Sequence, residues 1–247
     1  MKNILVSIVI TYFKKKDFIE KTLKSLHNQS LKKYQVIFVY DETDKKDLIY
    51  IKKLLLKFKN KKLIVNKKNL GVAQSRNIAM KHIKGKYTAF LDADDLWRKH
   101  KLKRQLDIML KKEKDLSYTS YDLIDKKGKK IGKRIISKKT SYKKLIKKCE
   151  IGLSTVMIKS SILKKFKFPL LKTQEDFGLW LKLLRYNYKF YAIDTIHSSW
   201  RKENSSLSSN TIQKIIDAFK LFYKYENKNF IFSIYSVVIL SINKLIN

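Results

Sequence analysis

The chain has 247 residues, of which 57 are Lys or Arg and 21 are Asp or Glu, so its formal net charge is +36 at pH 7. This length, with an apolar content of 44%, predicts one large domain with a sizeable core and excludes a disordered chain. Only six of the cations are Arg, the residue that nucleic-acid-binding proteins favour, so the charge predicts no specific nucleic-acid partner. The single cysteine, Cys149, excludes an internal disulfide and a Cys-rich zinc site.

Neither end of the chain predicts a targeting or membrane-spanning segment. The apolar run Ile4–Ile10 lacks a cleavage site, and the cluster Lys14–Lys16 follows it, which is the wrong side for a signal peptide, so we expect a first strand. Phe230–Ile242 is apolar but about half to two-thirds as long as a span. We expect a helix that either packs on the domain or lies on a membrane surface. The lysines around it would favour an anionic surface. The expected location is the cytoplasm, with peripheral contact at the inner face of its membrane left open.

Strand-like runs alternate with helical patterns through the first 95 residues. The runs are continuously apolar, which predicts a parallel sheet covered by helices on both faces. The expected strands are Ile4–Ile10, Val36–Val39, Leu63–Val65 and Tyr87–Leu91, and the helices between them begin near Asp17, Asp47 and Val72.

After Asp95 the pattern becomes mixed. A helix is expected from about Lys99 to Lys112, and a two-piece helical tail from about Asn210. We therefore divide the chain into residues 1–95, a nucleotide-binding βαβ half, residues 96–209, an acceptor-binding mixed half of the same domain, and residues 210–247, the tail. The remaining expected elements are strands at Leu116–Tyr121, Leu123–Ile124, Ser154–Ile158 and Phe190–Ile193, and helices after Ser160 and from Asp176 to Tyr186.

Three carboxylates follow the strand Tyr87–Leu91 within four positions, and their burial beside a core is costly unless a positive charge is present. Side chains alternate along extended backbone, so Asp92 and Asp94 can face one Mg²⁺ or Mn²⁺, an ion that usually carries substrate phosphates. The plain alternative is a solvated loop whose last residue, Asp95, caps a helix. Asp41 ends another strand, and ligands bind at the carboxyl ends of parallel strands, so both acidic clusters are expected in one site.

Five segments, in this order, resemble glycosyltransferase family 2, whose members are inverting, nucleotide-sugar-dependent enzymes of GT-A fold. The resemblance implies a Rossmann-like, mostly parallel sheet flanked by helices, with a smaller mixed acceptor region and a helical tail. It also implies sugar transfer from a nucleotide diphosphate donor, UDP-linked in the typical case, to an acceptor hydroxyl with the help of Mg²⁺ or Mn²⁺. The segments are Ser7–Tyr12, Val39–Asp44, Asn69–Asn77, Phe90–Asp95 and Glu175–Asp176.

The donor-binding roles follow from the resemblance, position by position. Thr11 and Tyr12 match the place where the nucleotide is held. Asp41 matches the carboxylate that accepts a hydrogen bond from the base, a task that suits an acceptor-only group. Arg76 matches a cation for the diphosphate or a nearby carboxylate, although a purely structural pair with Asp92 is the competing reading.

Metal and catalytic roles follow in the same way. Asp94 matches the main metal ligand, and Asp92 supports it through sugar or ribose contacts. Asp176, preceded by Glu175, is the candidate general base for the acceptor hydroxyl, with a simple helix cap as its competitor. Arg201 belongs to a segment, Trp200-Arg201 with Ser206–Ser208, that resembles a loop closing over the phosphates.

Two departures limit the resemblance. Ile10 stands where many members have Pro, and Tyr40–Thr43 replaces Asp-Asp-Gly-Ser, so base recognition is less secure than metal binding. The Gln-x-x-Arg-Trp signature of processive synthases is absent. We therefore expect addition of a single sugar to a lipid-linked or cell-surface glycan precursor, as in lipopolysaccharide or capsule biosynthesis.

Other functional classes remain open. A basic nucleic-acid-binding protein would explain the charge, but not the acids at strand ends. A nucleotidyltransferase of related fold would normally carry a Gly-rich loop after the first strand, where this chain has Tyr12–Lys16. An inactive, partner-binding relative is opposed by the presence of both Asp94 and Asp176.

Overall fold

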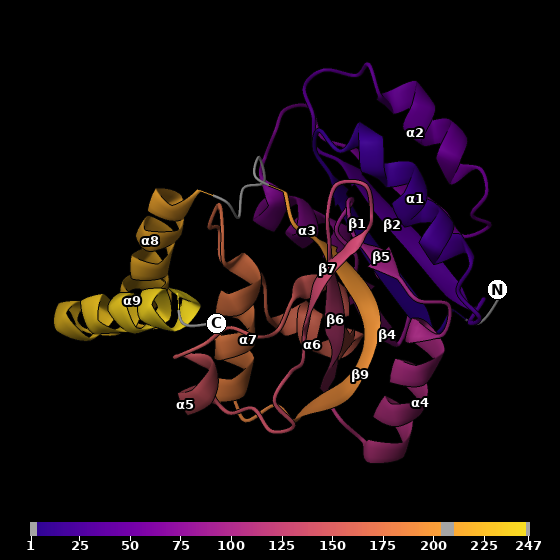
Figure 1. Ribbon diagram of the computed structural model, residues 1–247. Helices are drawn as coiled ribbons and strands as arrows, with labels where there is room; N and C mark the ends of the chain where they lie inside the picture. Colours follow the sequence, from indigo (N-terminus) through magenta and orange to yellow (C-terminus); the bar gives the residue numbers. More distant parts are fainter. Residues whose placement is uncertain (1–3, 204–209, 246–247) are drawn as a thin grey trace.

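The computed structural model describes residues 4–203 and 210–245 (Figure 1). Within these ranges nine strands form one sheet in the order β3-β2-β1-β4-β8-β6-β9-β5, with β7 paired to β6. The predicted α/β architecture with a helical tail is confirmed. Figure 1 shows helices packed around the sheet, and α8 and α9 at the left, beyond α7.

The amino-terminal part is the parallel half of the sheet. β1 pairs in parallel with β2 and β4, and β2 pairs in parallel with β3. β2 is buried along its whole length, which explains its uninterrupted apolar sequence. The elements are β1 (Val6–Tyr12), α1 (Lys16–His27), β2 (Tyr34–Tyr40), α2 (Leu48–Leu55), β3 (Lys61–Val65), α3 (Val72–Met80) and β4 (Tyr87–Phe90).

The middle of the chain adds strands of both directions. β8 pairs antiparallel with β4 and so joins the two parts of the sheet. β9 continues past Ile193, where the sequence predicts its end, because its later residues pair with both β6 and β5. The elements are β5 (Leu96–Trp97), α4 (Lys101–Lys112), β6 (Leu116–Ile124), β7 (Lys130–Arg134), α5 (Tyr142–Leu145), the 3₁₀ turn η1 (Leu153–Thr155), β8 (Met157–Lys159), α6 (Ser160–Lys165), α7 (Glu175–Arg185) and β9 (Phe190–Arg201).

Apolar side chains fill both faces of the sheet. On β2, Val36 and Phe38 pack with the helices α1, α2 and α4. Ile37 and Val39 point the other way, into a core shared with α3, α6 and α7. The alternation of a strand's side chains therefore connects two cores through one sheet and fixes the ends of β1, β2 and β4 at a common edge.

The tail consists of α8 (Thr211–Lys220), a π-helical turn η3 (Leu221–Tyr225) and α9 (Phe230–Leu245). It is fastened to the domain, because Leu221 and Phe222 are buried in the same core as α7. A Cβ on Gly178 of α7 would come within 2.7 Å of Leu221, so the two segments are in close contact. No helix among the described residues is long and apolar enough to cross a membrane.

Candidate active site

A cavity of about 1100 Å³ opens at the carboxyl ends of β1, β2 and β4. Parts of the chain that are far apart in sequence meet there, including the start of α7 and the end of β9. All of the residues to which the sequence assigns site roles line this cavity: Thr11, Tyr12, Asp41, Arg76, Asp92, Asp94, Glu175, Asp176 and Arg201.

The acidic loop after β4 is held in place by its backbone. The hydroxyl of Thr22, on α1, donates to the carbonyl oxygen of Ala93 at 3.0 Å. The N–H of Asp92 donates to the hydroxyl of Ser154 at 3.0 Å. These bonds fix the chain between Asp92 and Asp94 from two sides, so the carboxylates are presented to the cavity by a rigid loop.

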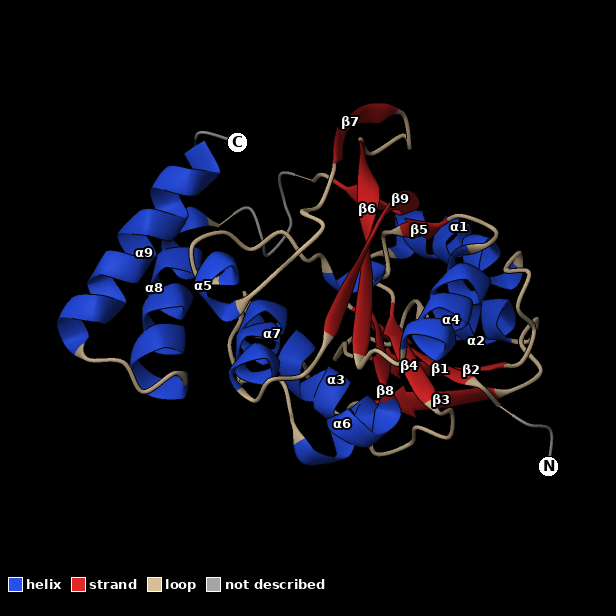
Figure 2. Cartoon of the chain, turned by 90° about the horizontal axis from the view of Figure 1, so that it is seen from below, coloured by secondary structure: helices blue, strands red, loops and turns tan. Residues whose placement is uncertain are grey.

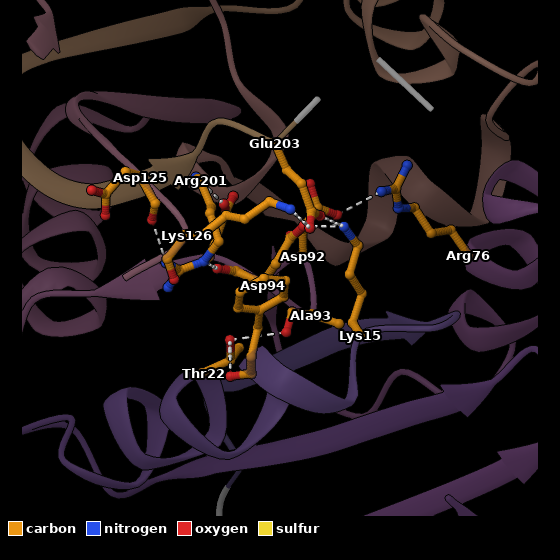
Figure 3. A network of polar contacts seen from close by, with 12 residues as sticks. Lys15, Thr22, Arg76, Asp92, Ala93, Asp94, Asp125, Lys126, Arg201 and Glu203 are labelled. Carbon is orange, nitrogen blue, oxygen red and sulfur yellow. Dashed lines mark hydrogen bonds and ion pairs between the residues drawn. The ribbon is translucent and has the colours of Figure 1, made fainter. Parts of the chain in front are cut away.

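Lys15 forms an ion pair with Asp94 of this loop (Figure 3). Its ammonium lies 2.8 Å from Asp94 Oδ2 and 2.5 Å from Glu203 Oε2. The sequence does not predict the roles of Lys15 and Glu203, since a run of three lysines does not reveal which one points into the cavity. Burial raises the pKa of Asp94 in spite of Lys15, and the nearby Asp92 carboxylate adds to the rise. The Asp94 carboxylate is therefore only partly compensated.

Arg76 joins two further carboxylates. It is buried on α3, donates to Asp92 Oδ1 at 2.7 Å and forms a second ion pair with Glu175 at the start of α7. The structural pair with Asp92 that the sequence left open is therefore present. Because Arg76 links the loop after β4 to α7, it sets the position of α7 relative to the acidic loop. Glu175 is buried and paired with Arg76, so it is not positioned as a solvent-exposed base.

Asp176 is the second residue of α7 and differs from its neighbour. Its Oδ1 accepts a hydrogen bond from the N–H of Phe177 at 2.7 Å, and among the described residues no ion pair reaches it. Burial, followed by the Glu175 charge, raises the pKa of Asp176 to about 7. A carboxylate with this pKa can accept a proton near neutral pH.

A missed residue on the tail supports the start of α7. The N–H and the hydroxyl of Thr173 both donate to Asp217 Oδ2, at 2.8 and 2.9 Å, and Asp217 is buried. Gln174, next in the chain, has φ +62°, a backbone conformation that non-glycine residues rarely adopt. The tail thus holds a strained turn directly before Glu175 and Asp176. No local sequence signal identifies Asp217, because its partner is 44 positions away.

The predicted nucleotide residues fall into two groups. Oδ1 of Asp41 accepts hydrogen bonds from the Asn66 amide at 2.7 Å and from the N–H of Leu70 at 2.9 Å, so this carboxylate is firmly oriented. The ring of Tyr12, in contrast, is buried in the core, and its hydroxyl donates to Asp47 Oδ2 at 2.8 Å. Tyr12 therefore contributes to the cavity as part of its framework, next to the partly exposed Thr11.

Arg201 is held by backbone carbonyl groups. Its guanidinium donates to the backbone carbonyls of Asp94, Asp125 and Lys126 at 2.9, 2.6 and 2.9 Å (Figure 3). Its own N–H donates to Asp95 Oδ1 at 2.9 Å. Its guanidinium therefore braces the acidic loop through backbone carbonyls while Arg201 also lines the cavity, and closure of Arg201 over the phosphates stays a prediction. Ser206–Ser208, the rest of that predicted segment, lie outside the described residues.

Whether the cavity can hold a metal ion depends on which side chains are available as ligands. Among the described residues, no group of three or more His, Cys, Asp or Glu side chains is arranged to hold a metal ion. Mg²⁺ and Mn²⁺ are commonly held by one or two carboxylates together with substrate phosphates and water, which does not require such a group. Asp94 faces the cavity and is only partly compensated, and Asp92 lies near it. These residues fit a divalent cation whose remaining ligands come from a bound diphosphate.

The far side of the cavity is basic and includes the tail. Leu240 and Asn243 of α9 line it, together with four cations. Asn243 also donates to the backbone carbonyl of Lys147 at 3.0 Å, which holds α9 against the domain. The cations are Arg134, Lys148, Lys172 and Lys214.

Sequence comparisons identify relatives. A sequence model described as glycosyl transferase family 2 matches residues 7–168. The UDP-Glc:alpha-D-GlcNAc-diphosphoundecaprenol beta-1,3-glucosyltransferase WfgD of Escherichia coli is 33% identical over 217 residues, which cover 87% of this chain and 84% of WfgD. The same description applies to WfaP of Escherichia coli, at 32% identity over 86% of this chain and 83% of WfaP.

Solved structures share the fold. A crystal structure of S. aureus TarS in complex with UDP-GlcNAc superposes with a TM-score of 0.72 at 21% identity, over 90% of this chain and 64% of that one. The mannosyltransferase PcManGT from Pyrobaculum calidifontis, in complex with GDP-Man and Mn²⁺, gives a TM-score of 0.70 at 14% identity, over 91% and 64%. This chain therefore spans slightly less than two thirds of either solved chain.

Proposed function

The chain belongs to glycosyl transferase family 2 and is a glycosyltransferase of GT-A fold, and from this premise we propose that it transfers one sugar from a UDP-sugar to a lipid-linked glycan precursor. The observation that carries the proposal is the single cavity in which Asp41, Asp94 and Asp176 meet. WfgD, a relative similar over most of both chains, is described as using UDP-Glc and an acceptor on diphosphoundecaprenol.

The donor lies across the ends of β1, β2 and β4. Asp41, oriented through Oδ1, accepts a hydrogen bond from the uracil with its other oxygen, and Thr11 lies beside the nucleoside. Lys15 then serves as a counter-charge for the diphosphate, because its ammonium already lies at the acidic loop. Arg76 keeps Asp92 in position to contact the sugar or ribose.

The residues that would hold a divalent cation, Mg²⁺ or Mn²⁺, are Asp94 and, in support, Asp92. When bound, the cation neutralises the charge that develops on the departing diphosphate. Arg201 contributes indirectly, because it fixes the Asp94 carbonyl and so the loop that carries both carboxylates.

Asp176 is the general base. As the acceptor hydroxyl attacks the anomeric carbon from the face opposite the diphosphate, its proton passes to the Asp176 carboxylate, and the configuration at that carbon is inverted. The pKa of about 7 makes Asp176 a stronger base than an ordinary aspartate, while leaving a large fraction ionised near neutral pH. Glu175 assists through its charge and through the ion pair that positions α7.

The acceptor enters from the tail side. The basic side chains there, among them Arg134 and Lys172, suit an acceptor that carries a diphosphate, such as a glycan on a polyprenyl diphosphate. Such an acceptor is anchored in a membrane, so the protein works as a peripheral enzyme at the inner face of the cytoplasmic membrane, in the biosynthesis of a cell-surface polysaccharide.

The proposal is tested by donor binding and transfer. UDP, GDP and CMP are titrated calorimetrically with and without Mn²⁺, and radiolabelled UDP-sugars are then offered with a short-chain polyprenyl diphosphate carrying GlcNAc. We expect UDP to bind more tightly with Mn²⁺ and one labelled sugar to be transferred.

Each alternative has its own outcome. Release of pyrophosphate in place of UDP would indicate a nucleotidyltransferase. Binding to DNA that falls steeply with salt, with no response to nucleotides, would indicate a nucleic-acid-binding protein.

A further inference from the structure

The helical tail buries polar side chains as well as apolar ones. Asp217, Glu226, Ser233 and Ser236 are buried toward the domain, where Asp217 accepts from Thr173 and Glu226 accepts from the hydroxyl of Tyr142 at 2.8 Å. The opposite face is apolar and exposed. Of the 22 large apolar side chains that are exposed among the described residues, 11 lie between Ile212 and Ile242.

These side chains lie on two helices that contact each other. On α9 the spacing of i, i+3, i+4, i+7 and i+11 places five of them on one face, and the first residues of α8 repeat the i, i+3, i+4 spacing. The two helices are joined by aromatic contacts, since Phe219 lies 5.5 Å from both the Tyr223 and the Phe230 ring centroids. We define the apolar tail face as Ile212, Ile215, Ile216, Tyr223, Phe230, Ile231, Ile234, Tyr235, Val238 and Ile242.

The charges beside this face have one sign. Lys220 and Lys224 are exposed, and Lys228 lies over the rings of Tyr142 and Phe232. The two acidic residues between positions 210 and 245, Asp217 and Glu226, are both buried. An exposed apolar surface bordered by lysines has the chemistry of a helix pair that lies in the headgroup region of an anionic bilayer.

We propose that the apolar tail face docks the protein on an anionic lipid bilayer and thereby places the basic end of the cavity at the membrane surface. Leu240, Asn243 and Lys214 of the same two helices line that end of the cavity. An acceptor anchored in the bilayer therefore reaches Asp176 by passing along α8 and α9. This inference rests on the proposed function for the identity of the acceptor, but the docking itself does not require catalysis.

Charge complementarity favours a bilayer over a second copy of the chain. A symmetric dimer through this face would bring the lysines of two tails together, in a chain whose net charge is already +36. Anionic headgroups supply the opposite charge. Figures 1 and 2 show α8 and α9 at one side of the molecule, away from α1 and α2, so a bilayer can reach the face without obstruction by the rest of the domain.

The test reports which face touches lipid. In a full-length Cys149→Ser background, an environment-sensitive dye is attached through Ile231→Cys on α9 or through Ile49→Cys on α2. These two isoleucines are equally exposed, at 79% and 80%, but lie on different sides of the molecule. With vesicles of phosphatidylcholine and phosphatidylglycerol, we expect a blue shift and protection from iodide quenching at position 231 and neither effect at position 49.

A second variant measures the apolar contribution. Replacing Ile231, Tyr235 and Val238 by Ser should weaken partition into the same vesicles by about tenfold or more at high salt, whereas Ile49→Ser with Leu56→Ser should not. Equal dye responses at both positions, or no binding to vesicles, would overturn the proposal. So would a blue shift without vesicles accompanied by a doubled mass, since the face would then join two copies. Calorimetric UDP binding, measured in parallel, tests the proposed function independently.

Discussion

The carboxylates on the two sides of the cavity differ in whether a cation pairs with them. On the donor side, the two carboxylates of the acidic loop that face the cavity have cations: Asp94 lies against Lys15, and Asp92 shares Arg76 with Glu175. On the acceptor side, Asp176 has a backbone N–H but, among the described residues, no ion pair. Glu175 and Asp176 are adjacent in one helix, but only Glu175 forms an ion pair among the described residues.

This difference separates binding from proton transfer. A paired carboxylate orients other groups and holds a charged ligand, and its cation opposes the rise in pKa that burial causes. Asp176 has no such ion pair, and burial together with the Glu175 charge outweighs the opposing Arg76 charge and raises the pKa of Asp176 to about 7, which makes it a stronger base. The predictions below remove one side of this contrast at a time.

Loss of Arg76 should have the largest effect on stability. In Arg76→Met, Glu175 remains buried without its cation, and removal of one partner from a buried ion pair commonly costs about 3–5 kcal/mol. Chemical denaturation should show this loss, and Arg76→Met with Glu175→Gln should recover part of it. Arg104→Met, at an exposed position of α4, is the matched control. An unfolding free energy equal to that of the control would show that the pair does not hold α7.

Removal of the Asp176 charge should instead stabilise the protein, increasingly so as the pH rises from about 4 to about 7. Since the pKa of Asp176 rises from 3.8 to about 7 on folding, the folded state alone keeps the proton between these values, and the unfolding free energy falls as pH rises through them. Asp176→Asn should gain about 1–3 kcal/mol over the parent at pH 8 and nothing near pH 3. Denaturation at both pH values measures this. The exposed Asp107→Asn should show no such pH dependence, and the same behaviour in Asp176→Asn would count against a raised pKa.

The smallest effect is expected at Lys15. Lys15→Met removes the ammonium that competes for Asp94, so Mn²⁺ without nucleotide should bind about threefold to tenfold more tightly. The loss of free Mn²⁺ signal in electron paramagnetic resonance reports this binding. Lys53→Met on α2 is the control. Unchanged or weaker Mn²⁺ binding would mean that Lys15 and the ion do not share Asp94.

Much of the fold follows from the sequence, because local patterns determine it. Buried strands such as β2 are uninterrupted apolar runs, and α1, α3 and α7 begin within two residues of their predicted starts. The short strands β5 and β7 were missed, as was the extension of β9 to Arg201. Their pairing partners lie in distant segments, so tertiary contacts rather than local propensity determine them.

The sequence predicts which residues line the cavity better than it predicts the groups that these residues contact. Carboxylates at strand ends mark a ligand site whatever surrounds them, which is why Asp41 and Asp94 could be selected. The partners depend on side-chain direction: Lys15 is one of three consecutive lysines, and Arg201 faces backbone carbonyls that carry no sequence signature. The tail could be predicted as helical, but its exposed apolar side chains and its buried acidic residues appear only when its neighbours are known.

The most direct measurement compares Asp94→Asn with Asp176→Asn in two assays, calorimetric binding of UDP with Mn²⁺ and transfer of the labelled sugar. The account predicts that Asp94→Asn loses the Mn²⁺-dependent part of UDP binding. Asp176→Asn should bind UDP as the parent does and transfer about 10²–10⁴-fold more slowly. Equal loss of binding in both variants, or transfer at the parental rate by Asp176→Asn, would contradict the division of the cavity into a donor side and a base.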